Sequence, residues 1–251
     1  NTRRWAEQAA TWWQRPLLRR EARLLAAWEQ RALQAYPHCC IISEQDRDLL
    51  PAPHERVQIV PNGVDLQFFA PAQTAAAPAY ALVFVGNMGY RPNVEAAKIL
   101  AQQILPLVHK QLPNVRLLLA GARPSEEVKA LASAQVDISG WVDDIRTAYR
   151  AARLLVAPLF IGSGQQNKIL EAMALGVPCL TTTLVNNAIG AQVGKQIFIA
   201  DSVSDFAEQI CQLLQQPAQL AEVAREAAKF VRERYDWRSV MQQIKLPTIN
   251  P

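Results

Sequence analysis

Residues 152–183 read ARLLVAPLFIGSGQQNKILEAMALGVPCLTTT and contain two apolar runs separated by one helical segment. The first run covers residues 152–160, and the second covers residues 178–183. The segment between them follows a glycine-containing turn and stops at Gly176, a residue type that commonly ends helices, with Pro178 just beyond it. This order predicts a strand, a helix and a second strand.

The same alternation continues on both sides of this stretch. The expected strands lie at residues 81–86, 115–121, 136–142 and 196–200, and the expected helices at 93–110, 125–133 and, capped by Ser204, 204–215. Strands that are apolar throughout are typical of a parallel sheet that helices cover on both faces. We therefore expect an α/β fold with a doubly wound, Rossmann-like parallel sheet, in which ligands bind beyond the carboxyl ends of the strands.

The sequences that flank this core have their own patterns. Residues 1–36 have helical periodicity with a break near Pro16, and their apolar residues fall roughly on one face. Two short strands are expected at residues 39–42, which we expect to be buried, and at 57–60, with a short helix capped by Ser43 between them. The last expected helices lie at residues 217–234 and 236–246.

Composition and charge exclude several classes of protein. Half of the 251 residues are hydrophobic and 19% are charged, which is typical of a globular chain. No apolar run reaches transmembrane length and the first residues are polar, so we expect neither a membrane span nor a signal peptide. Residues 1–36 contain seven Arg and three Glu, which leaves 19 basic and 19 acidic residues elsewhere. The net charge of +4 therefore indicates one local basic patch and no general nucleic-acid surface.

The cysteines and histidines form no recognisable metal or catalytic pattern. Cys39, Cys40, Cys179 and Cys211 lie in apolar surroundings without CxxC spacing, so we expect buried free thiols in a reducing, cytoplasmic compartment. The three histidines lie far apart and share no motif. The sequence therefore predicts no metal site and assigns no histidine base.

The glycine turn at residues 162–164 is the first candidate for a ligand site. A strand, a glycine turn and a helix start direct backbone N–H groups and the positive end of the helix dipole toward one point, where a phosphate can bind. Lys168 lies one turn into the helix, and Glu171 follows on the same side. A phosphate beside Lys168 and sugar hydroxyls beside Glu171 would fit a nucleoside diphosphate. The alternative is a plain turn with a surface Lys–Glu pair.

The loop after the strand at 81–86 is a second candidate. In VFVGNMGYRPN, residues 83–93, the strand ends at Gly86, and Arg91 and Asn93 can donate hydrogen bonds to phosphate or sugar oxygens. The alternative is that Asn93 only caps the following helix.

Two further turns are candidates by their position. In GWVDD, residues 140–144, a nucleobase could lie in the loop near Val142, or one of the two aspartates only caps a helix. Asn62 and Gly63 form a sharp turn just before the α/β domain, where it would lie at the edge of the crevice.

Five segments, taken in order, resemble one family. They are IVPNGVDLQFF, LVFVGNMGYRPN, VRLLLAG, ISGWVDDIRTAYRAARLLVAPL and GSGQQNKILEAMALGVPCLTT. Together they resemble the nucleotide-sugar half of a GT-B glycosyltransferase of family 4, also called group 1, over roughly residues 36–240. The resemblance implies an enzyme of two Rossmann-like domains with the active site between them. It implies retaining sugar transfer from a nucleoside-diphosphate sugar, bound mainly to the C-terminal domain, without a metal or other cofactor.

The resemblance also implies roles for the candidate residues. Glu171 would bind the donor ribose, and Lys168 would neutralise the charge that develops on the leaving diphosphate, so both are expected as catalytic residues. Arg91 would act on the diphosphate from the opposite loop. The expected donor-binding residues are Asn62, Gly63, Gly86, Asn87, Arg91, Asn93, Trp141, Val142, Gly162, Ser163, Gly164 and Gln165.

The sequence departs from the family pattern at two places. Many members have a glutamate where Ser163 stands, so we expect a different recognition of the sugar. Many also have an arginine directly after the strand-end glycine and a Lys-Gly pair nearby, where this chain has Asn87 and Arg91-Pro92. These departures leave the identity of the phosphate-binding cation open.

The resemblance divides the chain into three parts. Residues 1–58 are expected to be the mostly helical tail of an N-terminal, acceptor-binding domain, and residues 59–216 the donor-binding domain. Residues 217–251 are expected to be helices that cross back toward the N-terminal domain. The whole chain of 251 residues is long enough for about one α/β domain of this kind. We therefore expect a fragment that is inactive alone, with the acceptor site and the general base outside it.

The expected partners are a nucleotide-sugar donor and a glycan or lipid-linked acceptor, as in bacterial polysaccharide or cell-surface glycan synthesis. The basic, tryptophan-rich residues 1–36 either lack their partners from the N-terminal domain or contact an anionic membrane at its inner, cytoplasmic face. Two other functions stay open: a non-catalytic module that binds a nucleotide sugar, and a sugar-nucleotide epimerase with a related fold.

Overall fold

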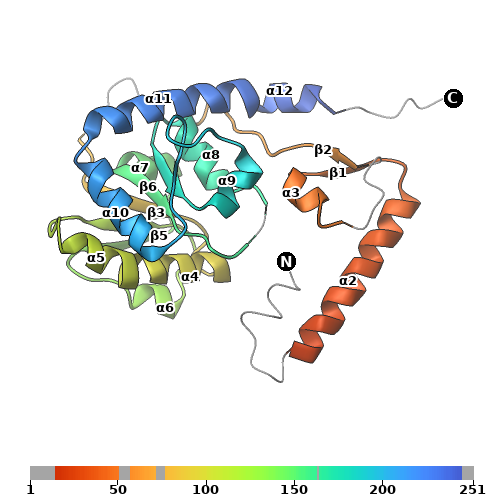
Figure 1. Cartoon of the computed structure of the whole chain (residues 1–251), viewed down its shortest axis with the longest axis horizontal. Helices are drawn as coiled ribbons and strands as arrows, with labels where there is room; N and C mark the ends of the chain where they lie inside the picture. Colours follow the sequence, from red (N-terminus) through yellow and green to blue (C-terminus); the bar gives the residue numbers. More distant parts are fainter. Residues whose placement is uncertain (1–14, 51–56, 72–76, 163, 245–251) are drawn as a thin grey trace.

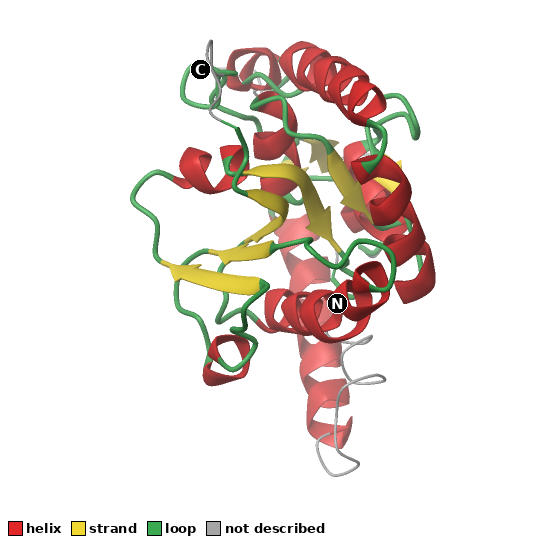
Figure 2. Ribbon diagram, turned by 90° about the vertical axis from the view of Figure 1, so that its left-hand side faces the viewer, coloured by secondary structure: helices red, strands yellow, loops and turns green. Residues whose placement is uncertain are grey.

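The computed structural model describes residues 15–50, 57–71, 77–162 and 164–244 of the chain. Its main body contains a six-stranded parallel sheet in the order β5-β4-β3-β6-β7-β8 (Figure 1). The strands are β3 (Tyr80–Val85), β4 (Leu117–Ala120), β5 (Val136–Gly140), β6 (Ala152–Ala157), β7 (Cys179–Thr181) and β8 (Phe198–Ile199). Helices lie on both sides of this sheet (Figures 1 and 2), so the predicted doubly wound α/β fold is confirmed.

The strand order reverses once, between β3 and β6. From β3 the chain adds β4 and β5 on one side and then returns to pair β6 with the other side of β3. Loops that leave neighbouring strands in opposite directions separate at such a point, and a crevice remains at the carboxyl ends of the strands. A ligand is therefore expected between the loop after β3 and the loop after β6.

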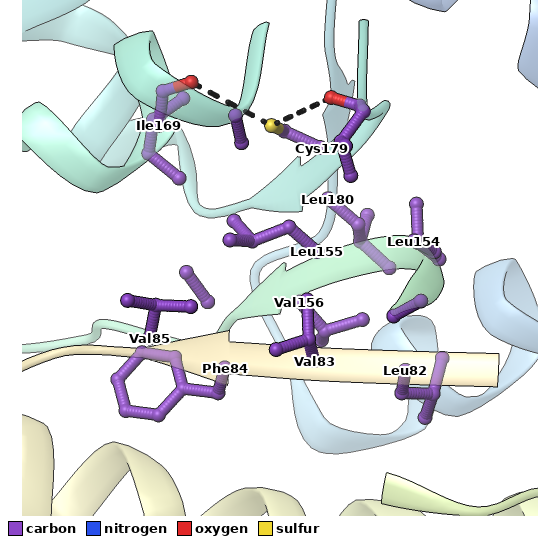
Figure 3. Packing of buried hydrophobic residues seen from close by; sticks show 14 of the residues in the cluster. Leu82, Val83, Phe84, Val85, Leu154, Leu155, Val156, Ile169, Cys179 and Leu180 are labelled. Atoms are coloured by element: carbon purple, nitrogen blue, oxygen red, sulfur yellow. Dashed lines mark hydrogen bonds between the residues drawn. The ribbon is translucent and has the colours of Figure 1, made fainter. Parts of the chain in front are cut away.

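The two central strands supply the middle of the hydrophobic core. Leu82, Phe84, Leu154 and Leu155 have no exposed surface. Figure 3 shows Leu82 and Phe84 on β3, Leu154 and Leu155 on β6, and Leu180 on β7, the next strand of the sheet. Both faces of these strands are covered, which explains why their sequences are apolar runs and not alternating patterns.

The helices of the main body alternate with the strands. They are α4 (Arg91–Ile99), η1 (Leu100–Ile104), α5 (Leu105–His109), α6 (Glu126–Lys129), α7 (Ile145–Arg150), α8 (Asn167–Ala174), α9 (Thr183–Ile189) and α10 (Val203–Leu214). Ser125 caps α6 and Asp144 caps α7, and in each case the side-chain oxygen accepts a backbone N–H of the first turn. Both helix starts were predicted from the sequence.

The structure corrects several of the helix predictions. α10 is capped by Ser202 and not by Ser204. α9 was not predicted, although it ends at Gly190 in the left-handed conformation that is typical of a helix stop. The helix expected at residues 93–110 contains a π-helical turn, η1, just before Pro106, which has no N–H to donate to the preceding turn.

The N-terminal flank forms a small separate unit. α2 (Arg15–Ala35) leads to β1 (Cys39–Ile41), which pairs in parallel with β2 (Val57–Ile59), and α3 (Glu44–Arg47) lies between the two strands in sequence. α2 extends away from the main body (Figure 1), and its apolar residues Leu24 and Trp28 are 59% and 63% exposed. Pro16 lies at the start of α2, where a proline loses no hydrogen bond, and the residues before it, on which the predicted break depends, lie outside the described residues.

The burial expected for the first strand and its cysteines was wrong in part. Cys40 is exposed and Cys39 is only half-buried, because the short helix α3 is the main element that contacts this two-stranded sheet. Cys179 and Cys211 are buried as predicted, and all four cysteines are free thiols.

The C-terminal helices run along the main body toward the N-terminal flank. α11 (Pro217–Arg234) continues into α12 (Trp237–Gln242), which ends beside β1 and β2 (Figure 1). At the junction of the two helices, the N–H of Val64 donates to the carbonyl of Tyr235 at 2.7 Å. The side chain of Gln58 in β2 donates to the carbonyl of Gln243. Within the described part of the chain, no helix is long and apolar enough to span a membrane.

Candidate functional site

The loops after β3 and β6 meet where the strand order reverses. The ammonium group of Lys168, on α8, donates a hydrogen bond of 2.7 Å to Oδ1 of Asn93, on α4. This bond joins the helix that follows β6 to the helix that follows β3, across the crevice expected from the strand order. Two residues that the sequence analysis placed in the site, 75 positions apart, are thus in direct contact.

Asn93 has a different place from the one predicted for a helix cap. α4 begins at Arg91 with Tyr90 as its N-cap, so Asn93 lies inside the first turn, and the prediction that Asn93 caps the helix was wrong. Its side chain is only 6% exposed, and its Nδ2 donates to the carbonyl of Asn87 at 3.0 Å. Both ends of this amide are therefore engaged within the protein, and a direct contact with a donor stays a prediction.

Lys168 lies in surroundings that weaken its affinity for a proton. The ammonium nitrogen is 5.0 Å from the centre of the Phe84 ring, and it forms no ion pair with any described residue. Burial lowers the pKa of Lys168 to about 8, and the charge of Glu171 acts in the opposite direction. Lys168 is therefore a charged but poorly solvated cation at neutral pH.

Glu171 is fixed by a residue that the sequence analysis did not identify. The hydroxyl of the buried Tyr149, on α7, donates to Oε2 of Glu171 at 2.6 Å. Burial raises the pKa of the Glu171 carboxyl, while the bond from Tyr149 and the charge of Lys168 lower it. Tyr149 lies within a segment quoted for the family resemblance, but its contact with Glu171 depends on how α7 and α8 pack, which no local pattern reveals.

The glycine turn has the backbone that its sequence suggests. Gly162 and Gly164 have φ angles of 128° and 82°, which residues with a Cβ atom rarely adopt. Ser163 lies outside the described residues. A Cβ atom on Gly164 would lie 3.1 Å from Oδ2 of Asp46, on α3. The N-terminal flank therefore brings an acidic residue to this turn, which the sequence analysis did not place in the site.

The Asn62-Gly63 turn lies against the glycine turn, at the edge of the site. The buried side chain of Gln165 accepts from the N–H of Asn62 at 3.1 Å and donates to the carbonyl of Asn62 at 2.7 Å. Nδ2 of Asn62 also donates to Oδ1 of Asn167 at 3.1 Å. A Cβ atom on Gly63 would lie 2.6 Å from the Trp237 ring. These contacts hold the turns together, and donor contacts of Asn62, Gly63 and Gln165 stay predictions.

Arg91 is occupied by carboxylates in this structure. It forms ion pairs with Glu95 at 2.6 Å and with Glu127 at 3.0 Å on the exposed surface of the protein. Asn87 uses its side chain locally, because Oδ1 accepts the N–H of Gly89 at 3.0 Å. Diphosphate binding by Arg91 would require it to leave these partners, so Lys168 is the better placed of the two cations.

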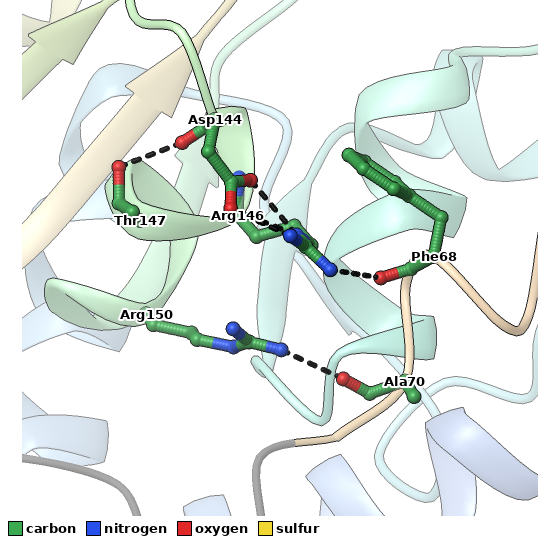
Figure 4. A network of polar contacts seen from close by, with 6 residues as sticks. All are labelled: Phe68, Ala70, Asp144, Arg146, Thr147 and Arg150. Carbon is green, nitrogen blue, oxygen red and sulfur yellow. Dashed lines mark hydrogen bonds and ion pairs between the residues drawn. The ribbon is translucent and has the colours of Figure 1, made fainter.

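The loop after β5 combines an exposed aromatic residue with a structural network. Trp141 is 75% exposed, and its Nε1 donates to Oδ1 of Asp143 at 3.1 Å. Asp144 caps α7 and binds Arg146, which in turn donates to the carbonyl of Phe68 (Figure 4). The capping interpretation is therefore confirmed for Asp144, while a nucleobase site at Trp141 and Val142 stays a prediction.

A separate cavity lies elsewhere in the main body. Its volume is about 530 Å³, and its lining includes Arg153, Pro178 and Leu220. Arg153 and Pro178 lie at the amino ends of β6 and β7, opposite to the edge where ligands of such sheets bind. The described residues also contain no group of three or more His, Cys, Asp or Glu side chains that could hold a metal ion.

Comparisons with known proteins agree with this architecture. A protein of Klebsiella pneumoniae, named "Uncharacterized 44.6 kDa protein in cps region", is 26% identical over 172 residues, which are 65% of this chain and 44% of that protein. The chain spans about half the length of the curated relatives it matches.

Two solved structures show the same fold. A mutant of S. aureus TarM, in complex with fondaparinux, alpha-GlcNAc-glycerol and UDP, matches with a TM-score of 0.70 and 16% identity, covering 83% of this chain and 43% of that chain. Anabaena HepE, in complex with UDP and glucose, matches with a TM-score of 0.69 and 16% identity, covering 82% of this chain and 61% of that chain.

The family comparison decides the classification. Residues 79–216 match the family described as "Glycosyl transferases group 1", and this region is more than half of the chain. It includes β3 to β8 and the crevice between the loops after β3 and β6. The resemblance inferred from the five sequence segments is confirmed, and the chain belongs to the group 1 family of glycosyl transferases.

Proposed function

We propose that the protein transfers a sugar, with retention of configuration, from a nucleoside-diphosphate sugar to a glycan or lipid-linked acceptor. The observation that supports this most directly is the pair of Lys168 and Glu171 at the reversal of the strand order, beside a glycine turn. A cation, a carboxylate and the backbone of a glycine turn at one crevice match the diphosphate and the sugar hydroxyls of such a donor. No metal or other cofactor is required in this proposal.

Lys168 acts on the leaving group. When the bond between the anomeric carbon and the diphosphate oxygen breaks, negative charge grows on the diphosphate, while the acceptor hydroxyl oxygen bonds to the anomeric carbon and its proton passes to a general base. A poorly solvated ammonium group interacts with such charge more strongly than one in water does. The N-terminus of α8 and the turn at Gly162 and Gly164 add backbone N–H groups and a favourable dipole at the same point.

Glu171 binds hydroxyl groups of the donor, with the ribose as the expected partner. Tyr149 occupies Oε2, and Oε1 has no hydrogen-bond partner among the described residues. A fixed carboxylate with one free oxygen can accept hydrogen bonds from a pair of neighbouring hydroxyls. In the same proposal the nucleobase lies near Trp141 and Val142, and Asn62, Gly63, Gly86, Asn87 and Gln165 line the site.

The relatives support the type of donor and the cellular process. TarM and HepE were both solved with UDP, which supports a nucleotide-sugar donor here. The Klebsiella relative is named for the cps region, which fits polysaccharide synthesis. Since this chain covers about half of its relatives, the remainder of the protein supplies the acceptor site and the general base, and the 251-residue chain turns over poorly alone.

Calorimetry with the full-length protein and a panel of UDP-, GDP- and ADP-sugars tests this function. One nucleotide sugar should bind, and Glu171→Ala should weaken that binding, while the exposed Glu208→Ala on α10 should leave it unchanged. Absence of binding across the panel would contradict the proposal. Binding without transfer and without slow donor hydrolysis would instead favour a non-catalytic binding module.

A further inference from the structure

The contacts of Asn93 differ from those of a residue that binds substrate. The side chain is 6% exposed, and both of its polar ends already have partners in the protein. The carbonyl oxygen of Asn87 can only accept a hydrogen bond, and the ammonium group of Lys168 can only donate one. The two partners therefore fix the orientation of the amide, with Nδ2 toward Asn87 and Oδ1 toward Lys168.

Gly86 makes this arrangement possible. A Cβ atom at Gly86 would lie 2.8 Å from Nδ2 of Asn93, closer than real Cβ contacts come. Gly86 is absent from the glycines with positive φ, so it is required for the close approach of the Asn93 side chain and not for an unusual backbone. Gly86, Asn93 and Lys168 thus form one connected unit across the reversal of the strand order.

The amide at position 93 also preserves the charge of Lys168. Within the described part of the chain, Glu171 of α8 is the carboxylate whose charge acts on the Lys168 ammonium, and no direct ion pair joins the two. The other groups that contact Lys168 are neutral: the Asn93 amide on α4 and the Phe84 ring on β3. An aspartate at position 93 would accept the same hydrogen bond, but it would neutralise the cation that faces the donor.

We propose that Asn93 is a positioning residue that holds the Lys168 ammonium at the mouth of the crevice without neutralising it, and that Asn93 does not itself contact the donor. This inference rests on the proposed function, because it assigns Asn93 an effect on the diphosphate through Lys168. It predicts that changes at position 93 alter the titration of Lys168 even when no nucleotide is present.

The first measurement therefore uses no nucleotide. The full-length protein is treated with an amine-specific acylating reagent between pH 6 and pH 11, and the modification of Lys168 is quantified by mass spectrometry. The wild-type lysine should be half-modified at the pH of its titration, near 8. Asn93→Asp should raise this midpoint by about one unit, and Asn93→Leu should lower it, because an opposite charge or a hydrogen-bond acceptor favours the ammonium form.

The second measurement compares UDP binding and sugar transfer. Asn93→Asp should weaken UDP binding about tenfold, as expected for the loss of one favourable charge. Asn93→Leu should lower kcat more than it changes KM, because a displaced ammonium group stabilises the charge of the transition state less well. Gly86→Ala, which leaves the amide intact but displaces it, should reproduce the effect of Asn93→Leu.

Asn186→Asp is the matched control, because Asn186 on α9 also makes two hydrogen bonds through its amide, but to the backbone of Ala191, which lies on neither α4 nor α8. It should lower thermal stability without moving the Lys168 midpoint or UDP binding. An unchanged Lys168 midpoint in folded Asn93→Asp and Gly86→Ala variants would overturn the positioning role, whatever the nucleotide data show. If the midpoints shift but the protein binds no nucleotide, the contact between Asn93 and Lys168 is supported and the proposed function is contradicted.

Discussion

The two longest helices of the described chain, α2 and α11, have similar patterns and opposite surroundings. They contain 21 and 18 residues, and both have apolar side chains along one face. α11 packs that face on α8 and buries Leu220, Val223, Ala224, Ala227, Ala228 and Val231, whereas α2 buries only Ala22. An amphipathic pattern predicts a helix, but it does not show where the partner of that helix lies.

The difference has a consequence for function. α8, the partner of α11, contains Lys168 and Glu171. A disturbance of α11 should therefore reach the proposed donor site through α8, while a disturbance of the exposed face of α2 should not. Changes in α11, at the α8 site and on the exposed face of α2 should have effects that decrease in that order.

Ala227→Asp on α11 should have the largest effect. Ala227 is fully buried, so the substitution places an unpaired carboxylate in the core. The free energy of unfolding should fall by about 4 kcal/mol, in the range for an uncompensated buried charge. Urea unfolding of the 251-residue chain measures it, with Ala221→Asp on the exposed side of α11 as the control. A loss similar to that of the control would show that the α11–α8 contact is weak.

Tyr149→Phe should have the next largest effect, because it removes the hydroxyl that donates to Glu171. A hydrogen bond to a charged group contributes about 1.5–3 kcal/mol, so unfolding free energy at pH 7 should fall by that amount. The loss should shrink in acid, where Glu171 is protonated, and nucleotide binding should weaken because the carboxylate is no longer fixed.

Tyr235→Phe is the matched control for this change. Tyr235 is also buried, and its hydroxyl donates to the neutral carbonyl of Ile189 at 2.6 Å. The free energy of unfolding of this variant should fall by about 1 kcal/mol, and nucleotide binding should not change. Equal losses at pH 7 in both variants would mean that the Glu171 carboxyl is uncharged in the folded protein.

The contrast between Tyr149 and Asn93 shows what the sequence could and could not predict. Apolar runs, glycines and capping residues predicted the sheet and the loops at its carboxyl edge, where the candidate site lies. Asn93 was misjudged as a helix cap because asparagine is common there, but Pro92 lies in the first turn and moves the start of α4 to Arg91. The hydrogen bond from Tyr149 to Glu171 joins residues that are 22 positions apart, on α7 and α8, and it depends on how these two helices pack.

The pH dependence of nucleotide binding should show a moderate effect. Burial lowers the pKa of Lys168 from 10.5 to about 8, so the cation is present at pH 7 and lost as the pH rises through 8. UDP affinity should fall about tenfold between pH 7 and pH 9, which corresponds to about 1.4 kcal/mol. Calorimetry at both values measures this, and Lys168→Met should bind weakly with little pH dependence in this range.

Stability should change in the opposite direction. Between pH 8 and pH 10.5 the unfolded chain keeps the Lys168 proton while the folded chain has lost it, so this residue makes the folded state relatively more stable as the pH rises. Affinity and stability that fall together over this range would show that general unfolding, and not Lys168, causes the loss of binding.

Leu24→Asp on α2 should have the smallest effect in the 251-residue chain. Leu24 is 59% exposed, so the free energy of unfolding should change by less than about 0.5 kcal/mol. In the full-length protein the same substitution should cost about 2–5 kcal/mol if the N-terminal half covers this face, because a leucine is then removed from a packed interface. A small change in both proteins, together with reduced sedimentation of the full-length protein with anionic liposomes, would instead assign this face to the membrane. A large loss in the 251-residue chain itself would contradict the contrast between α2 and α11, since it would require a buried partner for Leu24 within this chain.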